Sequence, residues 1–181
     1  MKATGIVRRI DDLGRVVIPK EIRRTMRIRE GDPLEIYTDR EGEVIFKKYS
    51  PMGELGSFAT QYAETLHKTC SLNVVITDRD GVVACAGVPR REFSDRQISP
   101  SARQLLENRG LYRHKEPDRR ISVTDVESDF FISCAMPIIT EGDVTGSVIS
   151  LTKNGESRPG EELENKLIQT AAGFLSRQLE S

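Results

Sequence analysis

The segment between Arg8 and Arg29 alternates short apolar runs with basic residues, and this pattern limits what the start of the chain can become. The segment holds eight Lys or Arg residues against three Asp or Glu residues. Its central run, Arg15–Ile18, has apolar side chains at both alternating positions, so as a strand it needs cover on both faces. A domain of about 50 residues buries too little surface to supply that cover alone. We therefore expect two chains to interleave in an obligate dimer.

The positive charge is local. Residues 1–50 hold twelve Lys and Arg against nine Asp and Glu, a net charge of +3, whereas residues 51–181 hold fifteen against nineteen, a net charge of −4. A basic region on an otherwise neutral chain is typical of a module that binds a polyanion. The 181 residues suffice for two small domains, and the charge asymmetry indicates that the two have different functions.

Composition excludes several classes of protein. The sequence has no apolar run as long as a membrane span and no signal-peptide pattern in residues 1–20, so we expect a cytoplasmic protein without a membrane partner. Its three cysteines, Cys70, Cys85 and Cys134, form no CxxC pair. That spacing argues against a disulfide framework and a zinc site, so we expect no metal and no cofactor.

Turn-forming residues around Pro51 divide the chain into a first domain at 1–50, a linker at 51–55 and a second domain at 56–181. The first domain contains four runs that are rich in β-branched and aromatic residues, which predict strands at Thr4–Ile10, Arg15–Ile18, Leu34–Thr38 and Glu43–Tyr49. Pro19 suits the first turn of a short helix. On that helix Ile22 and Met26 share one face, opposite a basic face formed by Lys20, Arg23, Arg24 and Arg27.

The second domain alternates helical and strand patterns, which predicts an α+β fold with an antiparallel sheet between helices. Predicted helices lie at 55–70, 99–108 and 160–179. Two strands flank the turn at Asp80-Gly81, and further strands are predicted at 121–124, 130–139 and 144–152. The apolar stripes at 55–70 and 163–179 are wider than one sheet edge needs, so we expect them to pair across a two-fold axis and make a tetramer.

The first 50 residues resemble the AbrB-type swapped-hairpin DNA-binding domain of bacterial transition-state regulators, through Thr4–Asp11, Leu13–Arg24 and Gly31–Ile36. The resemblance implies a β-barrel made by two interleaved chains that bind double-stranded DNA. The residues that it assigns to DNA contact are Arg8, Arg15, Arg23 and Arg24, with Arg9 and Lys20 as helpers. Because few polar side chains other than arginine lie on this face, we expect the protein to recognise DNA shape with a loose consensus.

The second domain looks like a GAF domain, with Leu72–Asp78 as its first strand, but it shows no ligand motif. An AbrB-type domain followed by a GAF-like domain resembles regulators of transcription in the developing forespore. That resemblance implies an activator and repressor of sporulation genes, associated with the nucleoid. A small molecule bound to the GAF-like domain would modulate it, and the irregular segment 88–101 is the candidate lining, although the same segment also fits a solvated loop.

Two other functions remain open. An antitoxin of a toxin–antitoxin pair would share the swapped-hairpin fold, but antitoxins usually carry a disordered tail, so rapid proteolysis of residues 53–181 would favour that class. An enzyme would need a set of catalytic side chains at suitable spacing. Cys85 and Cys134 lie in apolar strand patterns, and neither His67 nor His114 has a nucleophile or metal ligand at a useful spacing. We therefore expect no catalytic site.

Overall fold

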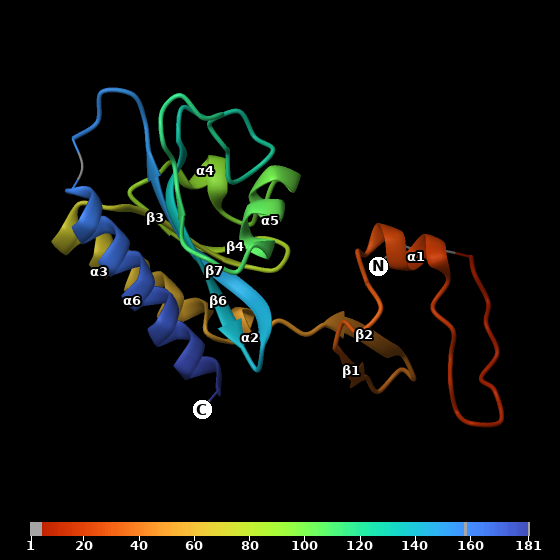
Figure 1. Ribbon diagram of the computed structural model, residues 1–181. Helices are drawn as coiled ribbons and strands as arrows, with labels where there is room; N and C mark the ends of the chain where they lie inside the picture. The colour runs from red at the N-terminus through yellow and green to blue at the C-terminus, as the bar shows by residue number, and fades with distance from the viewer. Residues whose placement is uncertain (1–4, 158, 181) are drawn as a thin grey trace. The chain divides into compact units, whose positions relative to one another are not determined.

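The computed structural model of the chain describes residues 5–157 and 159–180, and it divides into two compact units (Figure 1). The first unit ends at Tyr49 and the second begins at Ser50. Residues 51–55, which the sequence pattern marks as a linker, contain the short helix α2 (Pro51–Glu54). The side chain of Met52 in this helix is completely buried in the core of the second unit. The segment is therefore an ordered part of the second unit.

The first unit has one helix and one hairpin. Helix α1 (Lys20–Thr25) begins after Pro19, and strands β1 (Leu34–Thr38) and β2 (Val44–Lys48) pair antiparallel, with Ile36 opposite Phe46. The turn between them is closed by Asp39, whose carboxylate accepts hydrogen bonds from two backbone amides of residues 41 and 43. These elements agree with three of the sequence predictions.

The predicted strands at 4–10 and 15–18 are wrong for the single chain. Thr4 lies outside the described residues, and residues 5–18 form a loop with one tight turn, in which Asp11 N donates to Arg15 O at 3.0 Å. Figure 1 shows this loop running out from α1 and back without strands. A strand needs a neighbouring strand for its backbone N–H and C=O groups, and this unit offers none to residues 5–18.

Apolar side chains of the first unit are left uncovered. Val7 is 89% exposed, Leu13 70%, Ile10 and Val17 69%, and Ile36 62%, and no residue of α1 is buried. Thirteen of the fifteen large exposed apolar side chains in the described residues belong to this unit. A stable soluble domain does not normally expose so much apolar surface, and exposed apolar patches of this kind are typical of interaction surfaces.

The second unit is built on a five-stranded antiparallel sheet in the order β4-β3-β7-β6-β5. Its strands are β3 (Asn73–Asp78), β4 (Val82–Ala86), β5 (Tyr112–Arg113), β6 (Phe131–Thr140) and β7 (Asp143–Thr152). The predicted α+β arrangement, an antiparallel sheet between helices, is confirmed. The strand predicted at 121–124 is not formed. Thr124 makes an isolated bridge with Ile98, and the Ile121 carbonyl accepts a hydrogen bond from β6, but these two contacts do not form a continuous ladder.

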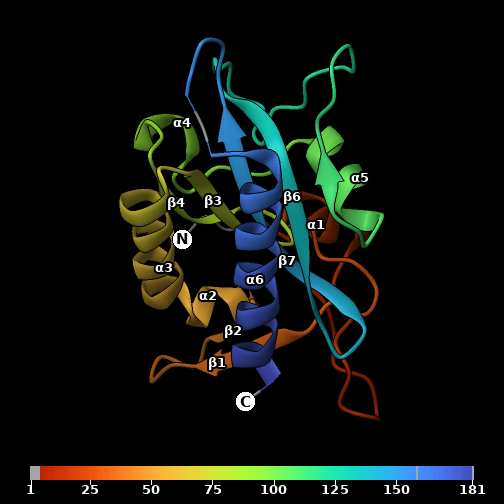
Figure 2. The same ribbon diagram turned by 60° about the vertical axis from the view of Figure 1, so that its left-hand side comes forward.

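Helices cover both faces of this sheet. Helices α3 (Gly56–Cys70) and α6 (Glu161–Glu180) lie side by side on one face, as Figure 2 shows, and bury a core that includes Leu66, Ile168 and Leu175. The other face is filled by α4 (Arg90–Phe93), α5 (Pro100–Glu107) and the apolar side chains beneath them. Helix α5 starts where the sequence predicts, because the Ser99 hydroxyl accepts the Ala102 amide and Pro100 needs no partner for its nitrogen.

A buried ion pair fastens α6 to the edge strand β5. The Glu164 carboxylate is 1% exposed and lies 2.8 Å from Arg113 Nη1, whose guanidinium is itself 11% exposed. The same nitrogen donates to Asn165 Oδ1 at 3.0 Å, and Arg113 Nε lies 3.2 Å from Glu161. A buried carboxylate is tolerated only when it is paired and hydrogen-bonded in this way.

Candidate nucleic-acid interface

Three of the predicted DNA-contacting residues lie on α1. Pro19 is the N-cap of this helix, and Ile22 within it is half-buried. Lys20, Arg23 and Arg24 are exposed. Arg27, which the helical pattern places on the same face, follows the end of the helix with a positive φ of 53°. The helix therefore presents a compact set of cations to solvent.

The other three predicted residues lie in the loop that precedes α1. Arg8 and Arg9 are exposed along the approach to the turn. Arg15 follows the turn, and its Nε lies 2.8 Å from Asp11 Oδ2. The Asp11 carboxylate also accepts the backbone amides of Leu13 and Arg15. These hydrogen bonds, above all the one from the Arg15 amide, hold the pKa of Asp11 below its usual value.

The six residues lie on two consecutive segments, three in the loop and three on α1. Among the described residues, Arg15 is the only one of the six with a carboxylate partner. By contrast, Lys48 lies 3.2 Å from Asp32 and donates to the Arg27 carbonyl, so its charge is occupied within the unit. Arg27 and Arg29 follow α1 and are also exposed. They are not among the predicted DNA contacts, although they lie in the same basic segment between Arg8 and Arg29. The unoccupied guanidinium groups suit phosphate oxygens.

The two histidines of the second unit, His67 and His114, contribute to its hydrogen bonding and packing. The His67 ring nitrogen Nδ1 is hydrogen-bonded to the Leu72 carbonyl at 3.0 Å, at the end of α3. The His114 ring is buried against Phe131, with ring centroids 5.1 Å apart, and its Nε2 lies 3.5 Å from Glu116. No group of three His, Cys, Asp or Glu side chains in residues 5–157 and 159–180 has the arrangement of a metal site.

The cysteines are free thiols, and two of them lie in the core. Burial, together with the negative charge of Glu164, raises the pKa of Cys134 to about 12. A thiol with such a pKa is almost entirely protonated at neutral pH and is a poor nucleophile. Cys85 is also buried, whereas Cys70 near the end of α3 is partly exposed.

This difference predicts how the native protein reacts with a thiol reagent at pH 8. We expect one thiol per chain, Cys70, to be modified, because the other two sulfurs are shielded. Mass spectrometry of peptides after brief treatment with iodoacetamide measures this, and treatment in denaturant should label all three. Modification of Cys134 in the folded protein, faster than that of Cys70, would contradict the structural assignment.

None of the described helices combines the length and the apolar character that crossing a membrane requires.

Both units of the chain match known protein families. The family model described as "Stage V sporulation protein T C-terminal, transcription factor" matches residues 54–180, and that described as "Antidote-toxin recognition MazE, bacterial antitoxin" matches residues 7–53. The chain is 47% identical over 180 residues to stage V sporulation protein T of Bacillus subtilis, with 99% of each chain covered.

The first unit is similar to a second relative. Over 51 residues it is 65% identical to the transition state regulatory protein AbrB of Bacillus subtilis, which covers 28% of this chain and 52% of AbrB. The solved N-terminal DNA recognition domain of AbrB is 63% identical, with 28% of this chain and 94% of that chain covered and a TM-score of 0.25. For the second unit, a solved GAF domain/HD domain protein from Geobacter sulfurreducens is 13% identical, with 74% and 99% covered and a TM-score of 0.48.

Proposed function

The chain belongs to the stage V sporulation protein T family of transcription factors, and we propose that it regulates sporulation genes by binding double-stranded DNA through residues 1–50. The observation that carries this proposal is the 65% identity of its first unit to the regulator AbrB. The exposed basic residues of that unit support it, because a local positive potential favours a polyanion. The regulator acts as activator and repressor in the cytoplasm of the forespore, associated with the nucleoid.

We assign the contacts with DNA to the six basic residues on the loop and on α1, namely Arg8, Arg9, Arg15, Lys20, Arg23 and Arg24. Their exposure leaves them open to phosphate oxygens. Phosphate contacts give affinity without reading sequence, so a face made mainly of guanidinium groups suits a sequence-tolerant regulator that recognises DNA shape.

We propose that the first unit is completed by a second copy of the chain. The exposed apolar side chains of the loop and hairpin would bury one another across the two-fold axis. Exchange between copies would also give residues 5–18 the neighbouring strands that a single chain does not supply. The loop arginines would then be fixed on a rigid scaffold.

The dependence of DNA affinity on salt tests the phosphate contacts. If each chain of a dimer makes about four such contacts, the slope of log affinity against log salt concentration is about −7. Arg24→Ala should make this slope shallower and weaken binding, whereas Arg40→Ala, in the β1–β2 turn, removes the same charge as a matched control. Fluorescence anisotropy with labelled duplex DNA measures both. A slope shallower than about −3 for the parent protein would refute the assignment.

The helices of the second unit support a further interface. Phe58, Tyr62 and Phe174 form one aromatic cluster across α3 and α6, with Phe174 5.8 Å from each of the other two rings. Phe174 is 40% exposed and Leu163 on the same helix is 54% exposed. We assign this surface to pairing with α3 and α6 of another copy, which makes the full protein a tetramer and raises its affinity for paired DNA sites.

The second unit also serves as a sensor in this proposal, with a small molecule as its effector. An antitoxin is the less favoured alternative. The antitoxin family model matches residues 7–53 alone, whereas residues 50–181 form a compact folded unit and residues 54–180 match the transcription-factor model.

A further inference from the structure

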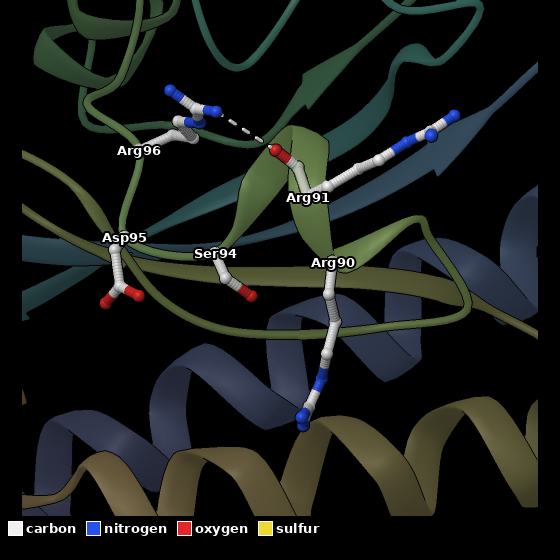
Figure 3. Close-up of a pocket in the computed structure, with 5 residues that line it drawn as sticks. All are labelled: Arg90, Arg91, Ser94, Asp95 and Arg96. Atoms are coloured by element: carbon white, nitrogen blue, oxygen red, sulfur yellow. Dashed lines mark hydrogen bonds between the residues drawn. The ribbon is translucent and has the colours of Figure 1, made fainter.

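The segment after β4 forms an open hollow of about 650 Å³ on the outer side of α4, lined by Arg90, Arg91, Ser94, Asp95 and Arg96 (Figure 3). The lining has three guanidinium groups and one carboxylate. Figure 3 shows Ser94 and Asp95 between Arg90 and Arg96, with the guanidinium groups spread around the turn. The three guanidinium groups point in different directions (Figure 3), and together they place positive charge on a unit that has a net negative charge as a whole.

Core packing and hydrogen bonds fix the backbone of the segment that forms this hollow. Phe93, at the end of α4, is 1% exposed and packs edge-on against Phe130 with the ring centroids 6.2 Å apart. The Ser94 amide donates to the Arg90 carbonyl at 2.7 Å, and Arg96 Nη2 donates to the Arg91 carbonyl at 3.2 Å. The segment 88–101 is therefore not a lid over an apolar cavity, because its apolar side is packed into the core and its charged side faces solvent.

The charges of the hollow are largely uncompensated. Arg90 and Arg96 make no ion pair in the described parts of the chain. Arg91 Nε lies 3.8 Å from Glu92 Oε1, a distance at the limit of an ion pair, and the other oxygen of Glu92 accepts a hydrogen bond from Ser128. Asp95 is the one acid of the lining, so the lining keeps a net charge of +2. Such a surface attracts an anion.

We propose that this hollow is the effector site and that it takes a small metabolite carrying a carboxylate or phosphate group. The inference rests on the proposed function, since it names the chemical class of the effector of a DNA-binding regulator. Guanidinium groups bind both kinds of oxyanion through charge-assisted hydrogen bonds, and the Ser94 hydroxyl, which lies 3.6 Å from Cys85 Sγ, lines the same hollow. Beneath the hollow, the core on this face of the sheet is filled by apolar side chains, so only the outer, polar side of the segment is open to a ligand.

A continuous set of hydrogen bonds leads from the hollow to the start of the second unit. The Val82 amide donates to the Arg96 carbonyl at 2.8 Å, which ties the hollow to the β3–β4 turn. In that turn Asp78 Oδ1 accepts the amides of Asp80 and Gly81. The other oxygen, Asp78 Oδ2, accepts the Ser50 hydroxyl at 2.9 Å.

Ser50 is the first residue of the second unit, and the preceding residue, Tyr49, donates its amide to Pro33 in the first unit. One peptide bond therefore separates a residue fixed to the DNA-binding unit from a residue fixed to Asp78. An anion that shifts the 90–96 turn on binding would act on this series of hydrogen bonds and so on Ser50. In this way anion binding by the second unit would be coupled to DNA binding by the first unit.

The test measures binding of two probes, inorganic phosphate and citrate, to the full-length protein by titration calorimetry at constant ionic strength. The variant Arg90→Ala/Arg96→Ala removes two charges from the hollow. Lys115→Ala/Arg119→Ala removes two exposed charges elsewhere on the same unit and is the matched control. We expect saturable binding of at least one probe, weakened at least tenfold by the first change and unchanged by the second. The probe that binds identifies the oxyanion. Absence of saturable binding, or equal loss in both variants, would overturn the site.

The coupling has its own measurement, the affinity for duplex DNA with and without the bound probe. We expect the probe to change DNA affinity severalfold in the parent protein and in Ser50→Thr, which keeps the hydroxyl. Ser50→Ala should bind the probe normally but lose its effect on DNA, and an effect that persists in Ser50→Ala would overturn the route. Failure of DNA binding in the parent without any probe would instead count against the proposed function, independently of the anion site.

Discussion

We expect the substitution Ile18→Asp to halve the mass of the proposed tetramer in solution and to lower its affinity for duplex DNA by about a hundredfold or more. Ile18 is half-buried and follows Val16 and Val17, which are 44% and 69% exposed. A carboxylate placed in the apolar interface between two copies has no partner there and prevents their association. Loss of the dimer removes about half of the phosphate contacts and the gain from binding two copies together.

Two measurements on one preparation check this result. Light scattering after size-exclusion chromatography gives the mass, and we expect four chains for the parent protein and two chains, held by α3 and α6, for the variant. Fluorescence anisotropy gives the DNA affinity. The control Ile18→Val keeps an apolar β-branched side chain and should behave as the parent in both assays. If Ile18→Asp retained the mass and the affinity of the parent, the dimer would not depend on residues 15–18.

The substitution Arg113→Met lowers the free energy of unfolding of the second unit by about 3–5 kcal/mol. The buried Glu164 carboxyl group then loses the guanidinium that lies 2.8 Å from it and is left in the core without its charged partner. The midpoint of thermal unfolding falls by on the order of 10 °C. Urea titration followed by circular dichroism measures the free energy, and the heat-induced change in ellipticity gives the midpoint.

Two variants separate the cost of an unpaired charge from the loss of an ordinary ion pair. Arg113→Met/Glu164→Leu removes both charges and should restore most of the stability, since an apolar pair of similar volume is tolerated in a core. Lys166→Met breaks an exposed pair on the same helix, where Lys166 and Glu162 are 69% and 83% exposed. That change should cost no more than about 0.5 kcal/mol. Equal losses for Arg113→Met and Lys166→Met would refute the argument.

Much of the second unit could be predicted from its sequence because its patterns are local. The apolar spacing of α3 and α6 and the Asp-Gly turn between β3 and β4 specify those elements without knowledge of the rest of the chain. The short strand β5 could not be predicted, since two residues carry no periodicity and only pairing with β6 defines them. The burial of His114 depends likewise on Phe131, which is distant in sequence.

Less of the first unit could be predicted from its sequence. Residues 15–18 have a strong β pattern, yet the single chain leaves them as a loop, because a strand also needs a neighbour. The candidate DNA-contacting residues follow from local charge density, which predicts that Arg23 and Arg24 are exposed but not how they lie relative to Arg8. In the proposed dimer that arrangement depends on the second copy, so no pattern within one sequence specifies it.

The uncovered apolar side chains of the first unit have a consequence for the timing of gene control. A DNA-binding unit that two copies complete forms in proportion to the square of the chain concentration while the protein is dilute. Doubling the amount of chain then raises the amount of binding-competent protein fourfold. Slow synthesis would in this way produce a delayed and steep onset of regulation, and dilution or partial degradation would end it with the same steepness.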